Sequence, residues 1–317
     1  MSKHIVSIGD LVLDIITPVR LPIEPFKHQE IRELEFQPGG SGNFMVMARR
    51  LGVRVSALGA LGKDAFGTQL WAMLESEGVE MDQVTVLPGS RTTLVYSLID
   101  VEHHQHTFVG YNARGPLVEY TPAMDAVLRS GDAIFMQAYN LIERQLPQVI
   151  DPILDSGRAA GIPIFFDVGP TAKHSTIERL DEVIGRCDYV MMTEDEVPLA
   201  ARGMQGEAAY AHLFGLGVRA LVIKQGPAGC TIIEREQRVQ VPGFAAELVD
   251  TVGAGDCFNA AFITTFLEGY DLRRCGVLAN AAGAASVQKL GGGLNVPTCA
   301  EVQTMLARRA EGIVLQC

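Results

Sequence analysis

Short runs of β-branched and aromatic residues alternate with segments of helical periodicity along most of the chain. Six such runs predict strands, and a helical pattern follows most of them. This alternation is typical of an α/β fold in which helices cover both faces of a mostly parallel sheet. The predicted strands are residues 5–8, 55–58, 133–136, 162–166, 189–192 and 221–223.

Polar residues follow several of these strands directly. Asp10, Asp167 and residues 194–196 each come just after a predicted strand. The carboxyl ends of parallel strands meet at one edge of a sheet, and ligands bind beyond that edge. We therefore expect these side chains to converge on one site.

Two regions interrupt the alternation. Residues 15–36 contain Pro18, Pro22 and Pro25, and residues 92–109 alternate apolar and polar positions. Both patterns predict extended strands outside the main sheet. Exposed strand edges seek partners, so we expect a homodimer that pairs through these regions.

Three histidines, His103, His104 and His106, lie close together in the second region. Their spacing puts two of them on one strand face, which suggests a metal site. No carboxylate or thiol motif accompanies them, so a surface role is the favoured interpretation.

Composition indicates a single domain, residues 1–317, with a small appendage. The chain has 317 residues, of which 48% are hydrophobic and 20% charged, enough for a sizeable core. Its net charge of −11 argues against a nucleic-acid or anionic-membrane partner. No apolar run is long enough to span a bilayer, and the N-terminus shows no signal-peptide pattern. Six cysteines without regular spacing predict reduced thiols in a cytoplasmic protein.

Near the C-terminus the chain reads Asp250-Thr-Val-Gly-Ala-Gly-Asp256, followed by an apolar helical pattern. The backbone N–H groups of Gly253, Ala254 and Gly255 would lie unpaired at a helix N-terminus, where they form a pocket for an anion. Asp256 would then accept a proton from a hydroxyl that attacks phosphorus. Its position in the first turn predicts a lowered pKa. The alternative is an ordinary turn whose acid stabilises the helix.

A second glycine-rich segment, Pro38-Gly39-Gly40-Ser41-Gly42-Asn43, precedes a helical stretch and a strand. Together with the segment around Asp256, about two hundred residues later, it resembles the two signature regions of the ribokinase (PfkB) family of carbohydrate kinases. The resemblance spans nearly the whole chain. It implies the ribokinase-like three-layer fold, with residues 15–36 and 92–109 as a small β-sheet lid over a sugar.

The resemblance also implies residues that bind the phosphoryl acceptor. They are Asp14, Gly39, Gly40 and Asn43. Ribokinases proper carry Asn and Lys where this chain has Val12 and Ser41, and a further ribose-contacting Glu is replaced near Gln137, so ribose is not the expected substrate. Arg114 suggests a bidentate contact to the carboxylate of a sugar acid, with a surface arginine as the alternative.

The resemblance also implies which residues surround ATP. They come from a Thr-x-x-Glu segment, a lysine at a strand end, a glycine turn and an Asn in a helix. Glu196 would hold Mg²⁺ through water, and Asp250 and Thr251 would help bind a monovalent cation, potassium. The nucleotide residues are Thr193, Glu196, Lys224, Gly226, Gly229 and Asn280.

We therefore expect an ATP-dependent kinase that phosphorylates a hydroxymethyl group of a sugar or sugar derivative. A nucleoside kinase of the same family and a non-catalytic sugar- or nucleotide-binding regulator are the open alternatives. A dinucleotide-dependent dehydrogenase and a Walker-type ATPase are excluded, because neither glycine spacing occurs in the chain.

Overall fold

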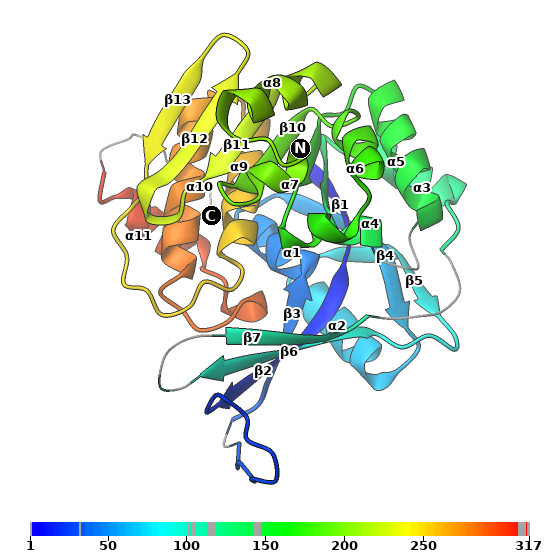
Figure 1. Cartoon of the computed structure of the whole chain (residues 1–317). Coiled ribbons are helices and arrows are strands. Elements are labelled where there is room, and N and C mark those ends of the chain that lie inside the picture. Colours follow the sequence, from blue (N-terminus) through cyan, green and yellow to red (C-terminus); the bar gives the residue numbers. More distant parts are fainter. Residues whose placement is uncertain are drawn as a thin grey trace.

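A large, mostly parallel sheet forms the centre of the computed structural model, which describes residues 2–31, 33–100, 102, 106–112, 118–142, 147–309 and 315 (Figure 1). Neighbouring strands pair in parallel from β5 across to β11, whereas β12 and β13 pair antiparallel at the other edge. In spatial order the nine strands are β13 (Arg238–Pro242), β12 (Gly229–Glu234), β11 (Ala220–Lys224), β10 (Tyr189–Thr193), β9 (Ile164–Asp167), β8 (Ala133–Gln137), β1 (His4–Ile8), β4 (Arg54–Gly62) and β5 (Glu80–Leu87).

Helices cover both faces of this sheet. Successive strand residues point to opposite faces, so Ile5 joins one buried cluster and Val6 the other. The first cluster packs against α1 (Ser41–Arg50), α2 (Ala65–Ser76), α9 (Ala254–Leu267), α10 (Leu272–Ser286) and α11 (Cys299–Leu306). The second packs against α3 (Pro122–Arg129), α5 (Pro147–Ala159), α6 (Ile177–Ile184), α7 (Val197–Ala200) and α8 (Gly206–Leu216). The three-layer α/β architecture expected from the sequence is thereby confirmed.

A second, four-stranded sheet lies below the large one in Figure 1. Its order is β3 (Glu35–Gly40), β2 (Leu11–Val19), β6 (Thr93–Asp100) and β7 (His106–Tyr111). The extended strands predicted within residues 92–109 are confirmed as β6 and β7. Of residues 15–36, only the two ends belong to strands: β2 begins earlier, directly after β1, and ends at Val19, β3 starts at Glu35, and the described residues between them form a loop. Asp14, Gly39 and Gly40 therefore belong to this small sheet, which carries them to the edge of the large one.

Two expectations from the sequence concern residues away from the site. Cys299 is disulfide-bonded, whereas Cys187, Cys230, Cys257 and Cys275 are free thiols. The expectation of six reduced thiols is therefore wrong, and the cytoplasmic location that it supported stays a prediction. His103 and His104 lie outside the described residues.

Among the described residues, no helix combines the length and the apolar character that a membrane span requires.

Candidate active site

The turn before α9 leaves backbone amides open at the helix start. Gly253 precedes the helix with φ 75° and ψ −1°, a left-handed conformation that favours glycine. The Ala254 N–H donates to Thr251 O at 3.2 Å, so this amide is used inside the turn and is not free as the sequence predicted. Within the described part of the chain, no acceptor pairs with the N–H groups of Gly255 and Asp256. These two amides carry the positive end of the helix dipole.

Two amide side chains hold the carboxylate of Asp256. Asn43 Nδ2 donates to Asp256 Oδ2 at 3.0 Å, and Gln137 Nε2 donates to Asp256 Oδ1 at 2.8 Å. Asn43 comes from the first turn of α1 and Gln137 from the end of β8, so three distant segments meet at this carboxylate. Its orientation is fixed by the protein alone.

The charge state of Asp256 differs from the expectation. Burial raises its pKa to about 7, and the nearby carboxylate of Asp167 acts in the same direction. The hydrogen bond from Asn43, the charge of Lys224 and the hydrogen bond from Gln137 oppose this rise but are outweighed. The lowered pKa predicted from the helix dipole is therefore wrong, because desolvation of a carboxylate outweighs a partial charge at the helix end.

Two further aspartates, Asp10 and Asp14, lie near Asp256. Both are buried, and burial raises the pKa of each to about 7; the charges of Asp10 and Asp256 add to the rise at Asp14. Gly39 and Gly40 carry no side chain and so make room for these two aspartates. A Cβ on Gly39 would lie 2.3 Å from the Asp14 carboxylate, and one on Gly40 would lie 2.4 Å from Asp10 O.

A buried ion pair lies on the other side of the helix start. Lys224 Nζ, at the end of β11, donates to Asp167 Oδ1 at 2.6 Å, and both side chains are 10% exposed. Burial disfavours the ammonium, but the charges of Asp167 and Glu196 outweigh it and raise the pKa of Lys224. A Cβ on Gly255 would lie 3.5 Å from this nitrogen. The lysine therefore adjoins the open amides of α9.

Glu196 ends the loop after β10. Its Oε2 accepts a hydrogen bond from the Thr193 backbone N–H at 2.8 Å, and burial raises its pKa while Lys224 opposes the rise. Thr193 Oγ1 is buried without a hydrogen-bond partner in the described part of the chain. These oxygens, with Asp167, are of the kind that Mg²⁺ prefers.

These oxygens do not form a complete metal-binding site within the described residues. Within the described residues, no group of three or more His, Cys, Asp or Glu side chains could hold a metal ion. The donor set fits an ion that keeps most of its ligands from water and phosphates.

The glycine turn and Asn280 have structural partners. Gly226 has φ 53°, and a Cβ on Gly229 would lie 2.1 Å from Val241 O, so the pairing of β12 with β13 excludes any larger residue. Asn280 Nδ2 donates to Val241 O at 3.0 Å and to Pro242 O at 3.2 Å, which ties α10 to the same strand.

Asp250 joins the turn before α9 to a second glycine segment, residues 291–293. One of its oxygens accepts hydrogen bonds from the N–H groups of Thr251 at 2.7 Å and Val252 at 3.2 Å. The other accepts from the Gly291 N–H at 2.8 Å. The two loops that the sequence assigned to a monovalent-cation site are thus linked.

The structure brings together most residues that the sequence singled out, and it adds three. Asp10 and Asp167 were expected at this edge only because they follow strands, and Gln137 was noted only as a replacement for a family Glu. Their contacts with the site depend on strand order, which no local pattern reveals. Arg114 lies outside the described residues.

Comparison with known proteins identifies the family. The profile described as pfkB family carbohydrate kinase matches residues 2–299. The chain belongs to the pfkB family of carbohydrate kinases. Members of this family are phosphotransferases that act on an alcohol group, and this chain is a sugar or nucleoside kinase of that kind.

Three relatives of this pfkB kinase are distant in sequence but match over at least 94% of their length. A nucleoside kinase of Methanothermobacter thermautotrophicus is 24% identical, covering 95% of this chain and 94% of its own. A ribokinase of Bacillus subtilis is 27% identical, covering 96% and 100%. The solved structure of the Arabidopsis thaliana ribokinase complexed with ribose and ATP is 22% identical, covers 96% and 99%, and superposes with a TM-score of 0.84. At that identity the structure shows the shared fold.

Proposed function

We propose that this pfkB kinase transfers the γ-phosphoryl group of ATP to a hydroxymethyl group of a sugar or sugar derivative, with Asp256 as the base. The observation that carries the proposal is the placement of the Asp256 carboxylate. Two amide side chains fix it at the start of α9, beside unpaired backbone N–H groups and a lysine. A proton acceptor and an anion pocket on neighbouring residues are what phosphoryl transfer to a hydroxyl requires.

On the acceptor side, Asp14 and Asn43 would hold hydroxyl groups, and Gly39 and Gly40 would let the substrate approach the backbone. Asp10 and Asp14 are buried carboxyl groups that remain able to donate or accept hydrogen bonds near neutral pH. Such groups suit a polyhydroxy compound. A contact of Arg114 with a sugar acid stays a prediction.

On the phosphoryl side, the amides of Gly253, Gly255 and Asp256 would stabilise charge on the transferred group. Lys224 would supply a positive charge next to them, and Asp167 holds it there. Mg²⁺, held through water by Glu196, would neutralise negative charge on the phosphate groups. Glu196 would orient its waters, with the Thr193 hydroxyl nearby.

The rest of the nucleotide would lie along the Gly226 and Gly229 turn and beside Asn280. The solved relative with the same fold, complexed with ribose and ATP, supports ATP as the phosphoryl donor. A nucleoside acceptor is the second candidate, which the match to a nucleoside kinase favours.

The experiment that tests the proposal is a coupled ADP-release screen over sugars, sugar acids and nucleosides with ATP and Mg²⁺, run in parallel with Asp256→Asn. The substitution keeps the shape and removes the proton acceptor. Turnover should fall by about two to four orders of magnitude while ATP still binds. Circular dichroism verifies folding. A folded variant with near-wild-type turnover would contradict the role of Asp256.

A further inference from the structure

Residues 291–296 contain a short 3-10 helix, η3 (Gly293–Asn295), and side chains from distant positions hold this segment in place. Asn43 Oδ1 accepts a hydrogen bond from the Gly293 N–H at 2.6 Å, and Gln37 Oε1 accepts one from the Leu294 N–H at 2.8 Å. With the bond from Gly291 to Asp250, three backbone N–H groups of this segment donate to side chains.

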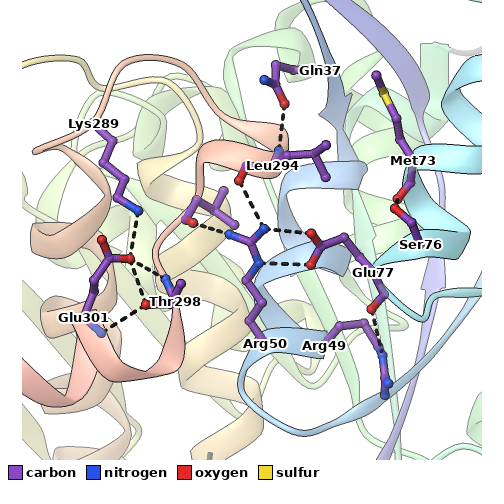
Figure 2. A network of polar contacts seen from close by, with 11 residues as sticks. Gln37, Arg49, Arg50, Met73, Ser76, Glu77, Lys289, Leu294, Thr298 and Glu301 are labelled. Carbon is purple, nitrogen blue, oxygen red and sulfur yellow. Dashed lines mark hydrogen bonds and ion pairs between the residues drawn. The ribbon is translucent and has the colours of Figure 1, made fainter.

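Arg50 binds the carbonyl groups of the same segment (Figure 2). Its guanidinium donates to Leu294 O at 3.1 Å and to Val296 O at 2.5 Å. The same group forms a bidentate ion pair with Glu77, at 2.8 and 3.0 Å, and the two side chains are only 19% and 22% exposed. A partly buried fork of this kind fixes both the position and the plane of the guanidinium.

A single side chain, that of Asn43, links residues 291–296 to Asp256. Asn43 and Arg50 lie seven residues apart on α1 and so project from the same side of the helix. Asn43 holds Gly293 with its oxygen and Asp256 with its nitrogen. A Cβ on Gly292 would lie 2.3 Å from Asn43 Oδ1, so the segment is in close contact with that side chain. A shift of residues 291–296 therefore moves or releases Asn43.

We propose that Arg50, fixed by Glu77, is a positioning residue for catalysis: it clamps residues 291–296 against Asn43 and thereby orients the Asp256 carboxylate. The inference rests on the proposed function, because it needs Asp256 to be the base. It gives the Arg50–Glu77 ion pair, which lies outside the site, a role in turnover. It also means that the Asn43 amide holds Gly293 and Asp256 together, so that each contact depends on the other.

The first test is Arg50→Lys, which keeps the charge but removes the fork that reaches Glu77 and two carbonyls together. We expect kcat to fall about 10- to 100-fold, since a small misplacement of a reacting group costs that much. KM for ATP should change less than about twofold, because the hydrogen bonds of Lys224 and Glu196 within the described residues go to Asp167 and Thr193 and not to the clamp. A rise in KM for ATP with kcat unchanged would overturn the proposal.

Arg49→Lys is the matched control. Arg49 is the neighbouring arginine on α1 and donates to Val53 O at 2.9 Å and to Glu77 O at 3.4 Å, both outside residues 291–296. The loss of these bonds affects the end of α1 and the backbone of Glu77 but removes none of the hydrogen bonds from Arg50 to the Glu77 carboxylate or to residues 291–296. We expect kcat within about twofold of the wild type, and an equal loss in both variants would overturn the proposal.

A double-mutant cycle separates positioning from general support of the fold. If Arg50 acts through Asn43, then Asn43→Ala combined with Arg50→Lys should be no slower than Asn43→Ala alone. If kcat of the double variant falls by the product of the two single-variant factors, the proposal is overturned. Should Arg50→Lys not fold, as judged by circular dichroism, Glu77→Gln replaces it in the same cycle, with a smaller loss expected in the same direction.

Asp256→Asn in the same assay keeps this inference distinguishable from the function on which it rests. If Asp256→Asn retains turnover, the proposed function fails. If turnover depends on Asp256 while Arg50→Lys runs at the wild-type rate, only the positioning role fails.

Discussion

Asp256 is held between two amides, and this arrangement determines its chemistry at the scale of the single residue. Asn43 and Gln137 each donate to a different carboxylate oxygen, so the carboxylate is oriented before a substrate binds. Burial raises its pKa to about 7. A base whose pKa lies near the working pH combines a usable basicity with a large deprotonated fraction.

The raised pKa predicts how the rate depends on pH. The base must be deprotonated, so kcat/KM should fall about tenfold per pH unit below about 7 and level off above it. Initial rates between pH 5 and 9, with circular dichroism at each pH, measure this fall in kcat/KM. A profile that stays flat down to pH 5 would contradict the raised value.

Asp14 predicts a pH-dependent effect on stability. Its pKa is about 7 in the folded protein, above the ordinary value of 3.8. Between these values the folded state binds more protons than the unfolded state, so this group lowers the free energy of unfolding as pH rises from about 4 to about 7. Asp14→Asn should therefore stabilise the ligand-free protein at pH 8 by roughly 2–4 kcal/mol, and hardly at all below pH 4.

Denaturant unfolding of Asp14→Asn at the two pH values measures the difference. Asp82→Asn, at an exposed position in β5, is the control and should leave both values unchanged. A variant that is destabilised equally at both pH values would show that Asp14 contributes through packing instead.

At the scale of the element, α1 connects three parts of the site. Its first turn supplies Asn43, its last residue is Arg50, and the strand before it, β3, supplies Gly39. The glycine segments on either side of this helix and before α9 are needed where backbone and side chain meet closely. Gly39, Gly40 and Gly292 leave no room for a Cβ, which would lie 2.3, 2.4 and 2.3 Å from a neighbouring atom.

Gly292→Ala tests this steric requirement. Its φ of −104° lies outside the left-handed region that favours glycine, and the new Cβ would lie 2.3 Å from Asn43 Oδ1. We expect kcat to fall at least about tenfold through displacement of Asn43. Gly215→Ala in α8, where a Cβ would meet nothing within 4 Å, is the control and should stabilise the protein by about 0.5–1 kcal/mol.

The link between two loops through Asp250 predicts an effect of potassium. If a monovalent cation binds beside Asp250 and Thr251, it should order residues 291–293 and the turn before α9, and so raise turnover. Rates in potassium and in a bulky organic cation at equal ionic strength measure the effect. Equal rates would leave Asp250 as a turn residue that only joins the loops.

At the scale of the whole molecule, the small sheet presents an apolar outer face. The groove there has a volume of about 580 Å³ and is bordered by the segment between β2 and β3. Ile23 and Phe26 of that segment are 58% and fully exposed. An exposed apolar groove beside free strand edges is a typical site of association. The groove is lined by Ile15, Thr17, Val19, Ile23, Lys27, Gln29, Ile31, Leu34, Phe36, Phe66, Tyr96 and Leu98.

We therefore expect a homodimer through this face. Light scattering at micromolar concentration should give twice the monomer mass, and Phe26→Asp combined with Tyr96→Asp should return the monomer. Ile177→Asp, an exposed apolar residue on α6, is the control and should leave the dimer intact. A wild-type monomer at that concentration would contradict the prediction.

The sequence by itself determined the alternation of strands and helices around six strands of the large sheet, and the two glycine-rich turns; β5, β12 and β13 were not predicted. Periodicity reports which face of an element is buried, and glycine before an apolar helix reports an open helix start; both are local properties. The sequence therefore predicted the three-layer fold, the extended strands of the small sheet and the placement of Asp256 at the start of α9.

Only the tertiary structure decided what surrounds Asp256 and what its pKa is. Gln137 and Asn43 reach it from positions 119 and 213 residues away in sequence. The dipole argument used the nearest turn alone and gave the wrong direction for the pKa, because desolvation depends on everything packed around the group. The clamp of Arg50 on residues 291–296 joins parts of the chain more than 240 residues apart, and no periodicity or motif encodes a contact at that separation.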